Sequence, residues 1–304
     1  MSNYTHRTAP PNNQDIWDGV VFLIVLFNQS PDESLSYQTL QKALVKITAN
    51  YQIILFDNTP KQSSYYTQDN RIIFCSNGEN SGLPIAYNFA AKQALTDKRK
   101  YLVIFDQDSV VTTQYIHTVW QELAKMTTND AVLVPNIVCK NKLISPYILN
   151  SLGLARIQNT SQQSPDLYAI NSFSVISVAA IEKIGFFDTF YWLDALDFHF
   201  FHRVHCQNLH VKRLDIAVEH NLSLINGNMP SWRLYNIAHY EMVFYAECLE
   251  PPAILVGLLK ILARGIKRHR DLHGIRGFLH YTHAALTGVV IGLKRRHSRH
   301  TVKT

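Results

Sequence analysis

The stretch Tyr101-Leu-Val-Ile-Phe-Asp106-Gln-Asp108-Ser109 decides the fold, because an apolar run ends there in two carboxylates one residue apart. An apolar run of this length between polar residues predicts a strand buried on both faces, as in parallel sheets. Side chains alternate along a strand, so Asp106 and Asp108 should share a face at the carboxyl edge, where open α/β sheets bind ligands. Two carboxylates there suit Mg²⁺ carrying a phosphate-bearing ligand. The alternative is a solvated strand end without a metal.

Length and composition set the broad class of the protein. The chain has 304 residues, of which 47% are hydrophobic, which allows one large α/β domain with an appendage. No apolar stretch reaches the roughly 18 residues that a transmembrane helix needs, and residues 1–18 lack the pattern of a signal peptide. The four cysteines are widely scattered, which argues against a zinc knuckle and a disulfide framework. We therefore expect a cytoplasmic protein with reduced cysteines.

Strand and helix signals alternate along the first half of the chain, which is typical of an α/β fold with a mostly parallel, Rossmann-like sheet and flanking helices. Strands are expected at residues 20–27, 52–56, 71–75, 101–105 and 131–134, and helices at residues 31–48, 84–96 and 114–126. Polar residues follow four of these strands, at Asn28, Asp57, Ser76 and Asp106. If the strands are parallel, these ends line one edge of the sheet and form one site.

The second half of the chain is less regular. Residues 141–166 predict loops, residues 170–178 a strand and residues 181–185 a short helix. Asp194 and Asp197 are three residues apart, so on a helix they share a face. We expect a disordered leader at residues 1–17, a sheet domain at residues 18–250 and a helical tail at residues 251–304.

Several short motifs follow one another between residues 20 and 222. They are Phe27-Asn28-Gln-Ser-Pro31, Phe56-Asp57-Asn58, Asn80-Ser-Gly82, Ala86-Tyr-Asn88, Asp106-Gln-Asp108-Ser109, Ile184-Gly185-Phe-Phe187-Asp188, Asp194-Ala-Leu-Asp197 with Arg203, and His220. With these motifs in this order, the chain resembles the family-2 glycosyltransferases of the GT-A fold, and most closely the bacterial rhamnosyltransferases of surface polysaccharide synthesis. Within this pattern, the motif Asp-Gln-Asp-Ser is the one associated with rhamnosyl transfer.

The resemblance implies a role for each matching residue. Contacts to the donor nucleotide fall on Asn28, Asp57, Asn80, Gly82, Asn88 and Asp106, and the metal ligands are Asp106, Asp108 and His220. The implied metal is Mg²⁺ or Mn²⁺, which stabilises the charge of the leaving diphosphate. Asp197 is the general base that takes the proton of the acceptor hydroxyl, with Asp194 as its rival. Structural alternatives are a turn for Asp57 and a salt bridge for Asp197.

Several positions depart from the family pattern, and one group of histidines lies outside it. Phe89-Ala90 stands where the family usually has a glycine nearby. Phe173 stands where many relatives have glycine, which predicts a reshaped sugar pocket. His220 is followed by Asn-Leu-Ser instead of a turn that ends in glycine. A zinc site at His199, His202 and His205 is disfavoured, because residues three apart drift around a helix and no cysteine or acid completes the set.

Most of the basic charge lies in the C-terminal part of the chain. Eleven Lys or Arg residues and one Asp occur from Lys260 onward, so this region carries +10; the whole chain carries +6 and the preceding residues −4. Lys260, Arg264 and Lys267 follow helical spacing among apolar residues, which predicts a basic amphipathic helix on an anionic membrane surface. Homo-oligomerisation through the apolar face is an alternative. Nucleic-acid binding is disfavoured, because no binding motif accompanies the charge.

Together these features predict an inverting, metal-dependent glycosyltransferase that is peripheral at the inner face of the cell membrane. The expected donor is a dTDP- or UDP-linked sugar, with rhamnose preferred. The expected acceptor is a glycan or lipid-linked glycan of the cell surface, as in O-antigen or capsule synthesis. Alternatives are transfer of galactose or galactofuranose, a nucleotidyltransferase, and a degenerate family member that serves as a scaffold. The nucleotidyltransferase is disfavoured, because residues 28–32 lack a glycine-rich basic loop.

Overall fold

The computed structural model describes residues 16–17, 19–61, 63–157, 166–220 and 229–301. The leader predicted at residues 1–17 therefore lies outside the described residues, except for Ile16 and Trp17. Trp17 is only 4% exposed, and its ring packs 5.9 Å from the ring of Phe22. Trp17 consequently belongs to the core of the sheet domain.

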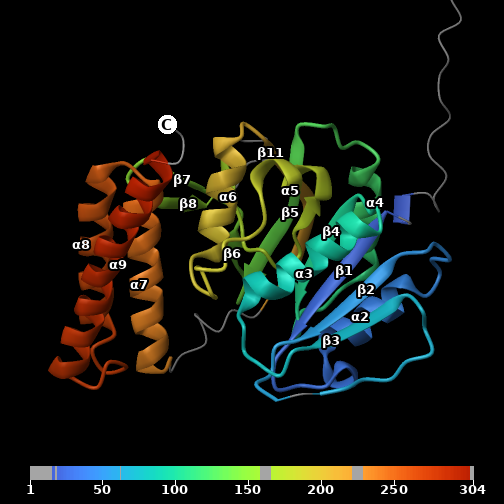
Figure 1. The fold of residues 1–304 in the computed structure, drawn as a ribbon, viewed down its shortest axis with the longest axis horizontal. Helices are drawn as coiled ribbons and strands as arrows, with labels where there is room; N and C mark the ends of the chain where they lie inside the picture. The colour runs from blue at the N-terminus through green and yellow to red at the C-terminus, as the bar shows by residue number, and fades with distance from the viewer. Residues whose placement is uncertain (1–15, 18, 62, 158–165, 221–228, 302–304) are drawn as a thin grey trace, which may run out of the picture.

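Four parallel strands form the first half of the central sheet (Figure 1). They are β1 (Val20–Leu26), β2 (Gln52–Asp57), β3 (Ile72–Ser76) and β4 (Tyr101–Asp106). β4 pairs with β1, β1 with β2, and β2 with β3, each time in parallel. The prediction that these strands end at one common edge is confirmed.

The second half of the sheet is mixed in direction. Its strands are β5 (Asp130–Cys139), β6 (Lys142–Ser145), β10 (Val175–Ser177) and β11 (His210–Glu219). The order along the sheet is β11-β5-β10-β4-β1-β2-β3, with β6 paired to β5. β10 runs antiparallel to both β4 and β5 and is much shorter than the strand predicted at residues 170–178.

The region predicted as loops contains a second, small sheet. Its antiparallel strands are β7 (Tyr147–Leu149), β8 (Ala155–Ile157) and β9 (Leu167–Tyr168). The loop prediction for residues 141–166 is therefore wrong where β6, β7 and β8 form. Strands this short carry too few alternating residues to be recognised as strands in the sequence.

Helices cover both faces of the central sheet, which explains why β1 is buried on both sides. One face carries α3 (Leu83–Thr96), α5 (Val178–Ile184) and α6 (Leu196–Cys206). The other carries α2 (Leu35–Leu44), which follows the short helix η1 (Pro31–Glu33), and α4 (Thr113–Leu123). The fold is thus an α/β sandwich with a mainly parallel central sheet.

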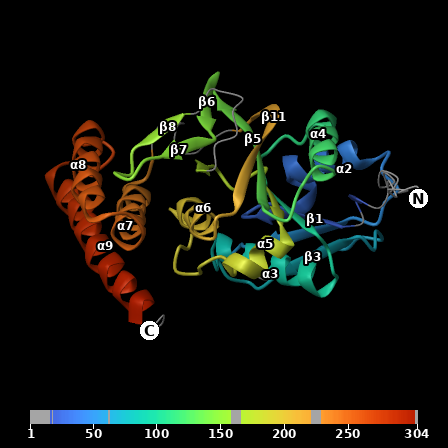
Figure 2. The same cartoon turned by 90° about the horizontal axis from the view of Figure 1, so that it is seen from above.

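Three further helices form a layer at one end of the molecule, beside α6 (Figures 1 and 2). They are α7 (Ser231–Cys248), α8 (Pro251–Lys267) and α9 (Ile275–Thr301). α9 packs closely on α7, because a Cβ atom at Gly288 or Gly292 would collide with backbone oxygens of α7. Among the described residues, no helix is long and apolar enough to cross a membrane.

Two cations of the predicted basic amphipathic helix, Lys260 and Arg264 of α8, are paired with a buried acid. The Arg264 guanidinium lies 2.7 Å from one carboxylate oxygen of Glu241 on α7, and Lys260 Nζ lies 3.4 Å from the other. Glu241 is buried, and although burial raises its pKa, these two cations lower it below its ordinary value overall. Of the three cations predicted for one helix face, Lys260 and Arg264 are therefore partly exposed and paired with Glu241, whereas Lys267 is exposed.

An ionic cluster joins α9 to the segment that precedes α6. Arg295 and Arg299 of α9 both bind Asp188 and the fully buried side chain of Glu247. Arg295 Nε lies 2.8 Å from one carboxylate oxygen of Glu247, and Arg299 Nη2 lies 2.6 Å from the other. His199 of α6 lies 2.9 Å from the same Arg299 nitrogen. Without these arginines Glu247 would be a buried carboxylate with no opposite charge beside it, which is strongly unfavourable.

Candidate active site

A cavity of about 830 Å³ lies at the carboxyl edge of β1 and β4 and extends to α7. Its wall combines residues that are far apart in the sequence, such as Phe27, Asp106, Asp197, His220 and Arg233. Most of the residues predicted for the site line it: Asn80, Gly82, Asp106, Asp108, Asp194, Asp197 and His220. The common edge predicted from the polar strand ends is therefore the place where the site forms.

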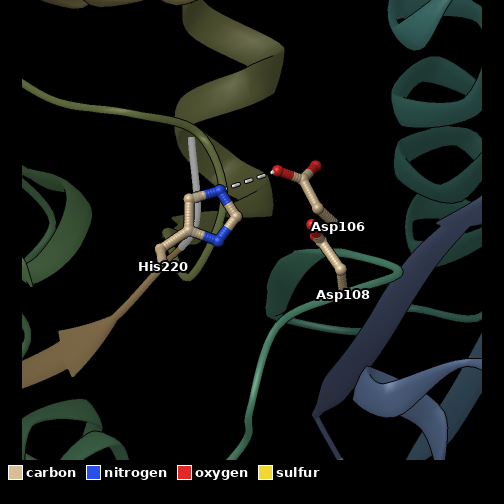
Figure 3. A group of neighbouring side chains, drawn as sticks. All are labelled: Asp106, Asp108 and His220. Atoms are coloured by element: carbon tan, nitrogen blue, oxygen red, sulfur yellow. Dashed lines mark ion pairs between the residues drawn. The ribbon is translucent and has the colours of Figure 1, made fainter. Parts of the chain in front are cut away.

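Asp106, Asp108 and His220 converge on one point of this cavity (Figure 3). Asp106 ends β4, Asp108 follows two residues later, and His220 comes directly after β11. Their ligand atoms all lie within 4.8 Å of one another, and His220 Nε2 is 3.2 Å from Asp106 Oδ2. Two carboxylates and an imidazole fit a divalent cation, with carboxylates suiting Mg²⁺ or Mn²⁺. These residues therefore match the predicted metal site in their chemistry and spacing.

The side chains of this group shift one another's pKa values. Burial raises the pKa of Asp108, and the nearby Asp106 carboxylate raises it further. For His220, burial lowers the pKa, but the hydrogen bond to Asp106 and the charges of both aspartates outweigh it, so the pKa is raised overall. Both shifts reflect the negative charge that Asp106 and Asp108 bring together at this point. A bound cation would relieve the same excess.

Asp197 lies in the first turn of α6 and lines the cavity. Burial raises its pKa to about 7, and the charge of Asp106 adds to the effect, while a hydrogen bond from the Asn171 N–H opposes it. A carboxyl group whose pKa is close to neutral can accept a proton during the reaction and release it afterwards, as a general base requires. Its position and its pKa therefore support the predicted role.

Asp194 lies outside α6, because the helix begins at Leu196 and the preceding Ala195 adopts a left-handed backbone with φ 59°. The prediction that Asp194 and Asp197 share one helical face is therefore wrong. Asp194 Oδ1 lies 3.0 Å from Arg233 Nη2. Burial raises the pKa of Asp194 to about 6, against the opposing effect of Arg233. Because the guanidinium already neutralises Asp194, Asp197 is the better candidate for the base.

Asn80 and Gly82 lie in the loop before α3, and the side chain of Trp192 packs against this loop. The Trp192 Nε1–H donates to the carbonyl oxygen of Asn80 at 3.2 Å. Gly82 has φ 85°, and a Cβ atom there would collide with the Trp192 side chain and backbone. Glycine is therefore needed here both for the backbone conformation and for the close approach of the indole ring.

Three residues predicted to bind the donor do not line the cavity: Asn28, Asp57 and Asn88. The Asn28 N–H donates to Thr59 Oγ1 at 2.7 Å, and Asp57 accepts the Thr59 N–H at 3.0 Å. The Asn88 amide exchanges two hydrogen bonds of 2.8 Å with the backbone of Phe187. Asn88 thus joins α3 to the segment before α6, and the donor contacts of all three residues stay predictions.

The expectation that Phe173 reshapes the sugar pocket is wrong. Its ring is buried in the core, with ring centroids 5.3 Å from Phe105 and 5.2 Å from Tyr115, and it does not line the cavity. Its backbone has φ 65°, in the region that favours glycine. The Tyr115 hydroxyl donates to the Phe173 carbonyl oxygen at 2.7 Å, which helps to hold this backbone.

Sequence motifs did not indicate the roles of several wall residues. Gln107 stands between the two aspartates, and its amide bonds both the N–H and the carbonyl of Phe27, which joins the turn after β4 to the end of β1. Its place inside the Asp-Gln-Asp motif was the available signal. Tyr147 and Trp192 gave no such signal, because their positions depend on β7 and on the segment before α6.

The model of glycosyl transferase family 2 matches residues 22–185, which is more than half of the chain. A search of curated proteins found no match. The match to this family favours glycosyl transfer over the nucleotidyltransferase alternative. It covers the first four strands, Asp106, Asp108 and the region up to the end of α5.

Similar solved structures share the fold at low sequence identity. S. aureus TarS 1-349 superposes with a TM-score of 0.52 at 13% identity, covering 93% of this chain and 91% of that chain. The mannosyltransferase PcManGT from Pyrobaculum calidifontis, in complex with GDP-Man and Mn²⁺, superposes with a TM-score of 0.50 at 12% identity. The match covers 91% of this chain and 86% of that chain. GalNAc-T7 with UDP, GalNAc and Mn²⁺ superposes with a TM-score of 0.51 at 14% identity, covering 82% of this chain and 58% of that chain.

These likenesses show the fold, which is of the GT-A type with additional C-terminal helices. The family match covers the motifs at Asn80–Gly82 and Asp106–Asp108, whereas Asp197 and His220 lie beyond the matched residues. The chain therefore belongs to glycosyl transferase family 2 and is a glycosyltransferase.

Proposed function

We propose that the protein is an inverting, metal-dependent glycosyltransferase that moves a sugar from a nucleoside diphosphate to a hydroxyl group of a glycan acceptor. The observation that carries this proposal is one cavity that contains both the Asp106–Asp108–His220 group and the carboxyl of Asp197. The first is suited to a metal-bound diphosphate and the second to proton removal.

In this proposal Asp197 accepts the proton of the acceptor hydroxyl while its oxygen attacks the anomeric carbon. The oxygen approaches from the face opposite the leaving nucleoside diphosphate, so one displacement inverts the anomeric configuration. A divalent cation held by Asp106, Asp108 and His220 would stabilise the charge that develops on the diphosphate. No covalent intermediate with the protein is needed.

The donor is best described as a dTDP- or UDP-linked sugar. Structures of the same fold were solved with UDP-GlcNAc in TarS, with UDP in GalNAc-T7 and with GDP-Man in PcManGT. The motif Asp106-Gln-Asp108-Ser109 supports rhamnose as the transferred sugar, and galactose or galactofuranose is the alternative within the class. The proposed acceptor is a glycan or lipid-linked glycan of the cell surface.

Thermal unfolding with a panel of nucleotides tests the donor and the metal together. We expect dTDP or UDP with Mg²⁺ or Mn²⁺ to raise Tm by about 5–10 °C at a ligand concentration of about 100 times Kd. GDP and CMP serve as matched nucleotides, and EDTA should remove the shift. If none of the four nucleotides stabilises the protein with either metal, the scaffold alternative replaces the enzyme.

We also propose an anionic membrane as the surface on which the enzyme works. α8 and α9 expose large apolar side chains opposite their buried faces: Leu255, Leu259, Leu262, Ile266, Leu279, Leu286, Val290 and Leu293. Exposed cations accompany them: Lys267, Arg270, Arg276 and Lys294. Residues 251–304 contain one acid, Asp271, and it is paired with Arg268. Apolar residues with unopposed cations fit an anionic lipid interface.

Cosedimentation with vesicles that contain phosphatidylglycerol tests this surface. The double variant Leu259→Glu/Ile266→Glu should lower the vesicle partition coefficient at least about tenfold, because two apolar side chains that the lipid would cover become charged. Val45→Glu is the matched control, since Val45 is 76% exposed but follows α2. Unchanged partition of the double variant contradicts the proposal. A wild-type dimer that the double variant dissociates would instead identify a second copy as the occupant.

A further inference from the structure

A closed chain of hydrogen-bonding contacts runs from β4 through two buried serines to His220 and back to β4. Ser172 Oγ accepts the Asp106 N–H at 3.2 Å and lies 3.3 Å from Ser109 Oγ. Ser109 Oγ lies 3.4 Å from His220 Nδ1, and His220 Nε2 lies 3.2 Å from Asp106 Oδ2. Ser109 is fully buried and does not line the cavity, so its hydroxyl group can act on a bound ligand only through neighbouring side chains.

We infer that the hydroxyl groups of Ser109 and Ser172 position His220, so that its Nε2 atom is held ready for the metal. This inference rests on the proposed function and adds two positioning residues that act through a metal ligand. Ser109 ends the motif that begins at Asp106, and neither the metal ligands nor the base explain why a serine stands there.

When His220 bonds Asp106, the hydrogen atoms run one way round the chain. An ionised carboxylate only accepts, so the hydrogen of a neutral imidazole is then on Nε2. Nδ1 is an acceptor in that tautomer, and the Ser109 O–H donates to it. Ser172 Oγ already accepts the Asp106 N–H, so its own O–H is left to donate to Ser109 Oγ. Each hydroxyl group thus donates once and accepts once.

A metal-bound imidazole needs the opposite direction. Nε2 binds a cation through its lone pair, so the one hydrogen of the neutral ring is then on Nδ1. Nδ1–H donates to Ser109 Oγ, and the Ser109 O–H turns to Ser172 Oγ. Because a hydroxyl group can either donate or accept, the same two serines hold His220 in both tautomers. A partner at the second ring nitrogen fixes the orientation of a metal-ligating histidine.

Packing places the imidazole of His220 but does not select which of its nitrogen atoms faces Asp106. The His220 N–H donates to the Val138 carbonyl oxygen at 3.0 Å, which fixes the backbone beside β5. The ring of Phe173 meets the imidazole edge to face, with centroids 6.3 Å apart, and offers no hydrogen bond. A half-turn of the ring would exchange Nδ1 and Nε2. The contact with Ser109 therefore favours the orientation in which Nε2 faces Asp106 (Figure 3).

Titration of the full chain with Co²⁺ tests the inference without a nucleotide or an acceptor. Co²⁺ binds a given set of nitrogen and oxygen ligands more tightly than Mn²⁺, and its visible absorption reports binding. Ser109→Ala should raise the Kd of Co²⁺ about tenfold or more, and Ser172→Ala should raise it in the same direction. Co²⁺ that still binds to Asp108→Asn is subtracted as binding to other side chains.

Ser109→Ala should fold like the wild type, because its turn is held through the backbone. Ser36 Oγ accepts the N–H of residue 109 at 2.9 Å and donates to its carbonyl oxygen at 3.0 Å, and both bonds survive the substitution. Ser174→Ala is the matched control. Ser174 is equally buried, and its hydroxyl group donates to the Ile170 carbonyl oxygen at 3.0 Å, so its loss should leave the Kd of Co²⁺ unchanged.

A double-mutant cycle with His220→Ala separates positioning from a general structural role. If Ser109 acts through the imidazole, Ser109→Ala should change the Kd of Co²⁺ by less than about twofold once His220 is replaced by alanine. A role in the shape of the turn would instead weaken Co²⁺ equally with and without His220. That result overturns the inference.

The remaining outcomes separate this inference from the proposed function. If His220→Ala weakens Co²⁺ but Ser109→Ala or Ser172→Ala keeps the wild-type Kd, the positioning role is overturned and the proposed metal site stands. If only Asp108→Asn weakens Co²⁺, His220 is not a ligand and the inference fails, while the carboxylates remain. If the wild-type protein binds no more Co²⁺ than Asp108→Asn does, the metal site of the proposed function fails and the inference fails with it.

Discussion

Asp197→Asn should lower kcat by about 10²–10⁴-fold while the Kd of the nucleotide with its metal stays unchanged. The substitution preserves the shape of the side chain but removes the carboxylate that accepts the proton of the acceptor hydroxyl. Asp197 lines the cavity in the first turn of α6 and is not one of the residues grouped as metal ligands. Product formation with the donor that the thermal panel identifies gives kcat, and calorimetry gives the nucleotide Kd.

The comparison with Asp194→Asn identifies the base. Because Arg233 already pairs with Asp194, Asp194→Asn should lower kcat much less than Asp197→Asn does. If Asp194→Asn lowers kcat as much as we expect for Asp197→Asn, and Asp197→Asn retains full turnover, the two roles are reversed.

The pH dependence of kcat provides an independent readout. A base must be deprotonated to act, and burial raises the pKa of Asp197 to about 7. The value of kcat should therefore rise with pH over a range well above about pH 4, near which an ordinary carboxyl group titrates. A bound cation weakens the contribution of Asp106, but the larger contribution from burial persists. A rate that is already maximal at pH 5 would show that another group, or an unperturbed carboxyl, removes the proton.

Asp108→Asn should remove the metal-dependent part of nucleotide binding and lower kcat/KM by about 10²-fold or more. The reason is that Asp108 supplies one of the carboxylates in the only group of three ligand-bearing side chains that lines the cavity in the described residues. Stabilisation of transition-state charge by a divalent cation is worth several kcal/mol, and each step of about 1.4 kcal/mol corresponds to a tenfold change in rate. Titration of the nucleotide with and without Mn²⁺ measures the effect.

A control for this substitution comes from the far end of the same sheet. Asp215 of β11 is an exposed acid that belongs to neither acidic cluster, so Asp215→Asn should leave metal-dependent nucleotide binding intact. If Asp108→Asn keeps the full Tm shift with nucleotide and metal, Asp108 is not a metal ligand and the Asp106–Asp108–His220 site is refuted.

The parts of the fold that could be predicted depend on local patterns. β1 to β4 are apolar runs that end in polar residues, and because parallel strands end at one edge, this pattern also located the site at Asp106 and Asp108. β10 could not be predicted in its true length, because only Val175–Ser177 pairs with β4 and β5, whereas the apolar character extends further.

Other features could not be predicted where one part of the chain determines the orientation of another. The spacing of Lys260 and Arg264 is helical as predicted, but their direction is set by Glu241 on α7, which spacing alone does not reveal. The left-handed backbone of Ala195 separated Asp194 from α6, and alanine carries no local signal for that conformation. Phe173 was assigned to the pocket from a family position, whereas packing against Phe105 and Tyr115 places it in the core.

The ionic cluster on α9 has a consequence for the order in which the enzyme is made. Asp188, His199 and Glu247 leave the ribosome before Arg295 and Arg299, because synthesis proceeds from the N-terminus. Until those arginines arrive, the nascent chain has two carboxylates at this position without their guanidinium partners, and burying them is unfavourable. We therefore expect the segment that leads into α6, and with it Asp197, to reach its final position only after α9 has been synthesised and docked.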